Sequence, residues 1–288
     1  MTEKSIIVKN LTYRYGNLLA VDHINFEVDA GEILGFLGPN GAGKTTTVKM
    51  LTGQLKPLEG QAILLGHDVV KETEKVRSRI GVCFEQTNLY EQMSAIDNLK
   101  LFAELFNVNN FDGNALLKRV GLAGREKDKV GGYSKGMKQR LMVARSLVNS
   151  PEIIFMDEPT TGLDPVSSEA IDNIILEERK RGATIFLTTH DMWEADKLCD
   201  RVAFMNEGKI AAVDTPHNLK LKYGKRSLIA EVAKANGELE KREISMDSTE
   251  TAQAVGELFN KEKVVTIHSE EATLEDIFIQ VTGRRLAE

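Results

Sequence analysis

The pattern of apolar and polar residues divides the chain into strand-rich and helix-rich stretches. Residues 6–37 read as three strands separated by tight turns, with strict alternation clearest at residues 24–28. Two more short strands are expected at residues 62–65 and 80–84. Over residues 92–122 the apolar positions take helical spacing. We expect the resulting stripe to pack in the core; its members are Ile96, Leu99, Phe102, Ala103 and Phe106.

From residue 151 onward, strands and helices alternate along the chain. Apolar, β-branched runs at 153–158, 184–190 and 201–208 are separated by amphipathic helices near 166–181 and 191–199. Such alternation indicates a parallel sheet covered by helices on both faces. A strand pair at 202–205 and 209–213 closes this α/β unit.

Beyond residue 225 the pattern changes again. Three strands, SLIAEVA, LEKREISM and KVVTIHS, and two helices at 249–260 and 273–284 predict a small α+β appendage. We therefore expect one α/β domain over residues 1–222, with a helical insert at about 89–150, and an accessory domain over 225–288.

The composition is that of a soluble globular protein, with 42% hydrophobic and 28% charged residues. The net charge of −6 gives no electrostatic footprint for nucleic acid, so no nucleic-acid partner is expected. No apolar run approaches the ~20 residues that cross a bilayer, and the first residues lack the pattern of a secretory signal. The two cysteines, Cys83 and Cys199, are far apart and read as small core residues of a cytosolic protein.

The segment from Gly38 to Thr46, GPNGAGKTT, follows an apolar strand and precedes a helix. Its spacing fits G-x-x-x-x-G-K-[ST], a loop whose backbone N–H groups surround phosphate oxygens. The helix N-terminus adds partial positive charge at the same place. Lys44 is expected to reach the β- and γ-phosphates, and the Thr45 hydroxyl to bind Mg²⁺. The chain is therefore expected to bind a nucleoside triphosphate.

Two acids end the apolar strand at residues 153–158. Because α/β sheets bind ligands beyond the carboxyl ends of their strands, Asp157 and Glu158 are expected beside the phosphate loop. Asp157 would complete the Mg²⁺ site, and Glu158 would orient or deprotonate the attacking water. Together with Lys44 and Thr45, these acids predict hydrolysis of the triphosphate.

Three further motifs lie around this acidic strand. YSKGMKQR at 133–140 precedes it, and TGLDP at 161–165 and TTHD at 188–191 follow it. With the phosphate loop, their order and spacing resemble the nucleotide-binding subunit of ATP-binding-cassette (ABC) transporters over roughly residues 5–220. The resemblance implies an α/β, P-loop NTPase fold, in which a RecA-like parallel sheet core carries an antiparallel β subdomain and an α-helical insert.

The resemblance also implies roles for individual residues. Tyr15 matches the aromatic residue that stacks on adenine, although Tyr13 is close enough to take that role. Ser134 and Gly136 match the signature that contacts the γ-phosphate of ATP held by the other subunit. Asp164 matches a loop at the dimer interface, and His190 matches the switch histidine that contacts the γ-phosphate.

The expected site comprises three sets of residues. The catalytic residues are Lys44, Glu158 and His190; the ATP-binding residues are Tyr15, Gly38, Pro39, Asn40, Gly41, Ala42, Gly43, Lys44, Thr45, Thr46, Ser134, Gly136 and Asp164; the Mg²⁺ residues are Thr45, Asp157 and Glu85.

The chain departs from the usual pattern at two places. Its signature is YSKGM where LSGGQ is usual, so Lys135 stands where glycine is expected, either assisting the phosphate or facing solvent. Where the family has a metal-sensing glutamine, this chain has Glu85, with Gln86 one residue later, and either can take that role.

The resemblance implies an ATPase in which two copies, or one copy and a close relative, sandwich ATP. A separate transmembrane permease would contact the region around residues 85–106 and hold the subunit at the cytoplasmic side of the membrane. The YSKGM signature and residues 272–284 resemble the branch that contains drug and polyketide exporters, so export is the expected direction. Two alternatives are a module that senses ATP without hydrolysing it and a soluble, non-transport ABC ATPase of cluster-assembly or regulatory type.

Overall fold

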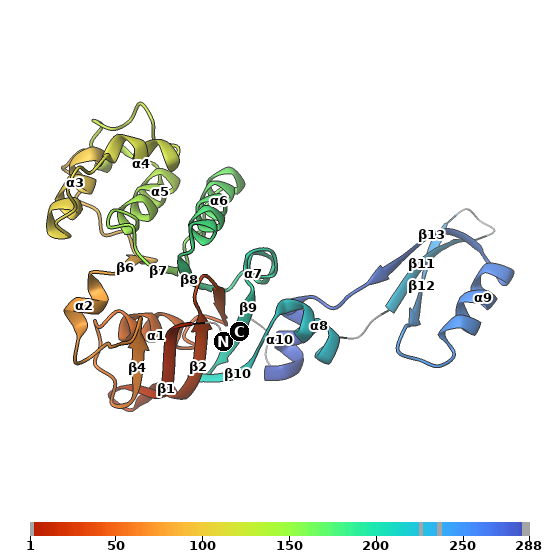
Figure 1. Ribbon diagram of the computed structural model, residues 1–288. Coiled ribbons are helices and arrows are strands. Elements are labelled where there is room, and N and C mark those ends of the chain that lie inside the picture. The colour runs from red at the N-terminus through yellow and green to blue at the C-terminus, as the bar shows by residue number, and fades with distance from the viewer. Residues whose placement is uncertain (1–2, 225–226, 235–237, 284–288) are drawn as a thin grey trace. The chain divides into compact units, whose positions relative to one another are not determined.

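The computed structural model describes residues 3–224, 227–234 and 238–283. The chain divides into two compact units, Met1–Val213 and Asp214–Glu288, whose elements are labelled in Figure 1.

A six-stranded sheet forms the centre of the first unit, in the order β10-β9-β3-β8-β7-β6. Its strands are β3 (Ile33–Leu37), β6 (Ile80–Cys83), β7 (Ile153–Asp157), β8 (Thr184–Thr189), β9 (Arg201–Asn206) and β10 (Lys209–Asp214). β3 pairs in parallel with β8 and β9, and β7 pairs in parallel with β6 and β8. Every residue of β3, β7 and β8 is buried, as expected for apolar runs in a sheet covered on both faces. The predicted parallel sheet is confirmed.

A second sheet of the first unit is antiparallel, in the order β2-β1-β4-β5. It contains β1 (Lys4–Tyr15), β2 (Leu18–Asp29), β4 (Glu59–Leu64) and β5 (His67–Asp68). Helix α1 (Lys44–Leu51) contributes Val48, Met50 and Leu51 to a core cluster that both sheets share. Within this cluster the ring centroids of Phe26 and Phe36 lie 5.5 Å apart. The phosphate loop therefore starts from a rigid, closely packed base.

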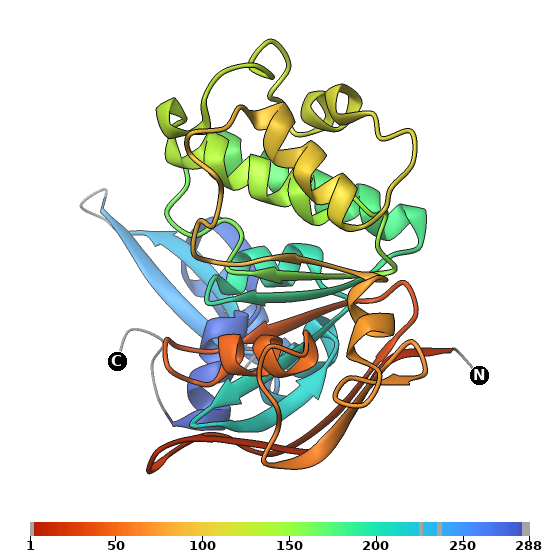
Figure 2. The ribbon, with the colours of Figure 1, turned by 90° about the vertical axis from the view of Figure 1, so that its left-hand side faces the viewer.

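The helical insert is grouped on one side of the parallel sheet, while α1 and the antiparallel sheet lie on the other (Figures 1 and 2). Its elements are α3 (Ala95–Leu105), α4 (Gly113–Arg119), the 3₁₀ turn η1 (Val130–Gly132) and α5 (Lys135–Ser146). Leu99 and Ala103 are buried, as the helical stripe predicts. Ile96, Phe102 and Phe106 are only half-buried, and the two phenylalanines line a groove, so the expectation that the whole stripe packs in the core is wrong for these three.

Three more helices are found in the described part of the first unit. They are α2 (Thr73–Arg77), α6 (Pro165–Arg181) and α7 (Met192–Leu198). Cys83 and Cys199 are both buried free thiols, which confirms them as core residues. Burial also raises the pKa of Cys83 to about 12.

The second unit is a small α+β domain. Its elements are α8 (Pro216–Tyr223), β11 (Ser227–Ala233), β12 (Leu239–Ser245), α9 (Thr251–Lys261), β13 (Lys263–Glu270) and α10 (Leu274–Thr282). The antiparallel sheet has the order β12-β11-β13, and Leu258 of α9 packs on Ala230 and Val232. Because the units divide after Val213, helix α8 falls in the second unit, although the sequence reading ends the first domain at residue 222. The end of the helix expected at 273–284 lies outside the described residues.

Across the described ranges, we find no helix with the length and apolar character that spanning a bilayer requires.

Candidate functional site

The phosphate loop connects the end of β3 to the start of α1. Gly43, at φ +108°, caps α1 in a left-handed conformation, and a Cβ there would collide with Ala20 O. Gly38 is also required, since its Cβ would overlap Met205 O. Among the described side chains none caps α1 by a hydrogen bond, so its first amides can bind an anion.

Lys44 is buried and points into the loop that precedes it. Its Nζ donates hydrogen bonds to the carbonyl oxygens of Gly38 and Pro39. The same Nζ lies 3.1 Å from Glu158 Oε1. The loop thus holds the ammonium where the phosphates of a nucleotide are expected, next to the acid that ends β7.

Asp157, the last residue of β7, reaches Thr45 across the loop. Thr45 Oγ1 donates to Asp157 Oδ1 over 3.3 Å, and Thr188 Oγ1 donates to the same oxygen. Burial raises the pKa of Asp157, against the effect of these two hydroxyls. Its Oδ2 is buried without a hydrogen-bond partner among the described residues. A hydroxyl and a carboxylate with an unused oxygen are hard donors that suit Mg²⁺, so these residues fit the expected metal.

Glu158 follows β7 in a left-handed backbone conformation, with φ +50°. For a residue other than glycine this conformation costs on the order of 1–3 kcal/mol. Its amide donates to Thr188 O over 3.0 Å, which holds the turn. Its Oε2 accepts from Thr161 Oγ1 over 2.8 Å and lies 2.8 Å from His190 Nδ1. The three expected catalytic residues, Lys44, Glu158 and His190, therefore meet in one cluster.

A cavity of about 370 Å³ lies over the phosphate loop. It is lined by Tyr15, Leu18, Ala20, Pro39, Asn40, Gly41, Gly43, Lys44, Thr45, Thr46, Glu85 and Glu158. Tyr15 is 44% exposed and lines this cavity, whereas Tyr13 packs partly on the core and meets the Tyr15 ring edge to face, with centroids 4.9 Å apart. Of the two glutamine-loop candidates, Glu85 and Gln86, it is Glu85 that lines the cavity.

The signature residues lie elsewhere in the subunit. Ser134 caps α5, accepting from Met137 N over 3.2 Å, and Asp164 caps α6, accepting from Ser167 N over 3.0 Å. A hydrogen bond from the Ser167 hydroxyl lowers the pKa of Asp164. Ser134, Gly136 and Asp164 are not among the described residues that line the cavity over the phosphate loop.

Comparison with known proteins identifies the family of this fold and site. The family model described as ABC transporter matches residues 21–161. The fluoroquinolones export ATP-binding protein of Mycobacterium tuberculosis is 46% identical over 283 residues, which cover 98% of this chain and 94% of that protein. The chain belongs to the ABC transporter ATP-binding family.

Two further similarities extend this result. The bacitracin transport ATP-binding protein of Bacillus licheniformis is 40% identical over 72% of this ABC chain and 69% of its own length. A dimeric, post-hydrolysis structure of an ATP-binding cassette with ADP and Pi superposes with a TM-score of 0.67 at 27% identity, over 73% of this chain and 98% of the other. The expected P-loop NTPase fold and ATPase class are confirmed: this ABC subunit binds ATP and hydrolyses it.

A second cavity of the ABC subunit, of about 230 Å³, lies beside His190. Trp193 and Glu194 of α7 line it together with the loop after β7. Trp193 is 70% exposed, whereas Glu194 is buried and accepts from Thr160 Oγ1 over 2.7 Å. Burial raises the pKa of Glu194 to about 7. Sequence reasoning did not single out Glu194 as part of this cavity; the available signal was a carboxylate four residues after His190.

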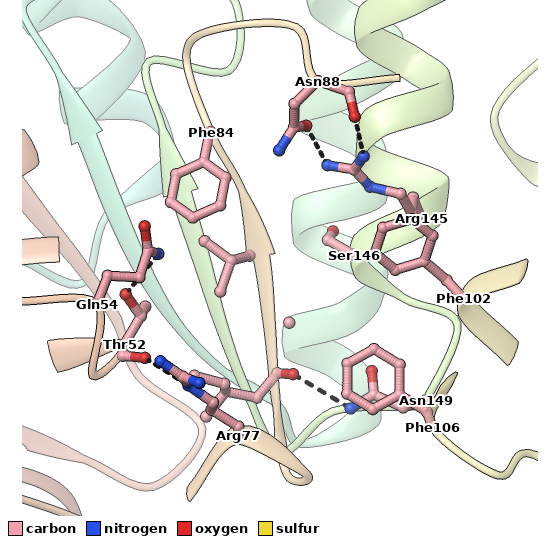
Figure 3. Close-up of a pocket in the computed structure, with 13 residues that line it drawn as sticks. Thr52, Gln54, Arg77, Phe84, Asn88, Phe102, Phe106, Arg145, Ser146 and Asn149 are labelled. Atoms are coloured by element: carbon pink, nitrogen blue, oxygen red, sulfur yellow. Dashed lines mark hydrogen bonds between the residues drawn. The ribbon is translucent and has the colours of Figure 1, made fainter. Parts of the chain in front are cut away.

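A third cavity of the ABC subunit is an apolar groove between the sheet and the helical insert (Figure 3). Phe84, Phe102 and Phe106 point into it, with Arg77 at its edge. Arg145 lies over the Phe102 ring, 4.6 Å from its centroid, and donates to Asn88 O over 2.7 Å. The buried guanidinium thus holds Phe102 and Asn88 in place in the groove wall.

Proposed function

We propose that this ABC ATPase is the nucleotide-binding subunit of an exporter. In this proposal two copies, or one copy and a close relative, enclose ATP and drive a separate transmembrane permease. The observation that carries the proposal is the convergence of Lys44, Asp157, Glu158 and His190 beside the phosphate loop. The names of the relatives support transport, and that of the fluoroquinolones export protein supports the direction.

The residues of one subunit divide the chemistry among them. Lys44 and the α1 amides would bind the β- and γ-phosphates, and Tyr15 would stack on the adenine. Thr45, Asp157 and Glu85 would hold Mg²⁺, which neutralises phosphate charge when bound. Glu158 would orient the attacking water and take its proton, while His190 fixes the Glu158 carboxylate through Oε2.

Ser134, Gly136 and Asp164 would act across the dimer interface. Ser134 and Asp164 are exposed, and none of the three residues lines the cavity of its own subunit, which supports a role toward the nucleotide of the partner subunit. The dimeric cassette with ADP and Pi to which this chain is similar supports dimerisation. Because ATP would contact both subunits, its cleavage would change the balance between a closed and an open dimer.

The permease would dock in the apolar groove of Figure 3. Three half-buried aromatic rings with arginine at the rim suit a short amphipathic segment of a membrane protein. This surface overlaps the region around residues 85–106 that the sequence reading expects to make the contact. Docking there would hold the subunit at the cytoplasmic side of the membrane.

One set of measurements tests the proposal. Purified protein is expected to release phosphate from MgATP, and membranes prepared gently from native cells are expected to retain the chain with one integral membrane protein. Binding of ATP without phosphate release would favour an ATP sensor. Phosphate release with complete loss of the chain to the soluble fraction would favour a non-transport ABC ATPase.

A further inference from the structure

The side chain of Lys135 extends from the start of α5 to the loop that follows β7. Its Nζ donates a hydrogen bond to Thr161 O over 2.9 Å. Gly162, at φ +67°, passes so close to this ammonium that a Cβ would collide with Nζ. Because position 135 is glycine in the usual signature, this contact is a feature of the YSKGM sequence of this chain.

The contact crosses a junction that is already closely packed. A Cβ on Gly136 would lie 2.6 Å from Ser167 Oγ, so the starts of α5 and α6 approach each other directly. Ser167 Oγ in turn donates to Asp164 Oδ2 over 2.7 Å. Lys135 adds a charge-assisted hydrogen bond at this junction, a type stronger than the neutral kind.

Thr161 connects Lys135 to the catalytic cluster through two hydrogen bonds. Its carbonyl oxygen accepts from Lys135, while its hydroxyl donates to Glu158 Oε2 over 2.8 Å. That same carboxylate oxygen lies 2.8 Å from His190 Nδ1. A single residue therefore joins the signature helix to the acid that is expected to orient water.

We propose that Lys135 is a positioning residue for hydrolysis in its own subunit, acting through Thr161 on Glu158, and not a ligand of the partner's nucleotide. Under the proposed function, which this inference assumes, Ser134 and Gly136 on the same loop contact the other nucleotide. Lys135 then couples the position of the signature loop, which contacts the partner's nucleotide, to the position of the Glu158 carboxylate in its own subunit.

The test compares steady-state ATP hydrolysis by three variants. Lys135→Met is expected to lower kcat by about three- to tenfold, with KM unchanged, because Thr161, the partner of Glu158, is no longer held by Lys135 while ATP keeps its contacts. Lys135→Arg retains a donor and is expected to keep at least about half of kcat. Lys127→Met, an exposed lysine outside the site, is the matched control and is expected to hydrolyse ATP at the wild-type rate.

A double-mutant cycle separates positioning from a general structural effect. Thr161→Val removes the hydroxyl that contacts Glu158 but keeps the carbonyl that accepts from Lys135. In this background Lys135→Met is expected to lower kcat less than about twofold, because the hydrogen bond from Thr161 to Glu158 is already absent. Additive losses would overturn the inference.

Two other results would also count against it. A rise in KM at constant kcat for Lys135→Met would instead assign the ammonium to the partner's phosphate, and unchanged kcat and KM would leave Lys135 without a role. Absence of hydrolysis by the wild-type protein is a different result, because it would overturn the proposed function itself.

Discussion

Lys44 Nζ lies 3.1 Å from Glu158 Oε1, and both side chains are only 6% exposed. The residue that is expected to bind phosphate and the residue that is expected to activate water are thus paired with each other. Glu158 Oε1 lies this close to the ammonium, yet among the described atoms it has no partner with hydrogen-bond geometry. We infer that phosphate oxygens and the Glu158 carboxylate compete for the same ammonium.

Glu158→Gln is expected to separate nucleotide binding from hydrolysis. The amide cannot take a proton from water, so kcat should fall by about 10²–10⁴, the usual contribution of acid–base catalysis. ATP affinity should be kept or increased, because Lys44 no longer pairs with a negative side chain. Phosphate release and calorimetry measure the two effects. Glu177→Gln, an exposed change on α6, is the control, and wild-type turnover by Glu158→Gln would exclude Glu158 as the base.

Lys44→Ala is expected to abolish ATP-dependent dimerisation. The change removes the ammonium that the phosphate loop holds against Gly38 and Pro39, so the phosphates lose their main countercharge. Sedimentation velocity with MgATP, in the Glu158→Gln background, measures the dimer. Lys49→Ala at the other end of α1 should dimerise normally. A dimer of undiminished affinity in Lys44→Ala would contradict the shared-site proposal.

Tyr15→Ala is expected to weaken ATP binding without lowering kcat. Loss of aromatic stacking on a base costs about 1–3 kcal/mol, or roughly five- to 150-fold in Kd. Tyr13→Leu is the matched comparison, because Tyr13 packs on the core and its change should affect melting temperature more than affinity. If Tyr13→Leu weakens binding more than Tyr15→Ala, the adenine contact belongs to Tyr13.

Glu194→Gln is expected to reduce the loss of stability at rising pH. Burial raises the pKa of Glu194 from 4.5 to about 7 in the folded chain. The folded state therefore keeps a proton that the unfolded state releases above pH 4.5, so this group's contribution to stability falls as pH rises from about 4.5 through 7 and then stays constant. The loss is on the order of 3 kcal/mol. Melting temperatures at pH 5 and 8 should differ more for wild type than for Glu194→Gln, and equal differences would refute the assignment.

Phe106→Asp is expected to release the permease while leaving the isolated ATPase intact. Phe106 lines the apolar groove, and a carboxylate there would be costly to bury under a partner. Leu105→Asp is the matched control, since Leu105 is the neighbouring residue, is 66% exposed and does not line the groove. Co-purification of the membrane protein should fall by about tenfold or more for Phe106→Asp. Equal retention by the two variants would place the permease contact elsewhere.

Sequence reasoning located the elements whose role is set by local pattern. The phosphate loop and the acids at the end of β7 were predicted because glycine spacing and an apolar run determine the local backbone. The contact from Lys135 to Thr161 could not be predicted, because it depends on how closely α5 and α6 approach. Phe102 and Phe106 share helical spacing with Leu99, and only the packing of the insert shows that these two rings line a groove.

Trp193 is the single tryptophan of the chain, and its mostly exposed ring lies in the cavity next to His190. Indole emission depends on the polarity of its surroundings, and with excitation selective for tryptophan the signal comes from this one position. The protein therefore carries an intrinsic fluorophore three residues from His190, and under the proposed dimerisation a change in Trp193 emission on adding MgATP would report whether this cavity becomes covered, without an attached dye.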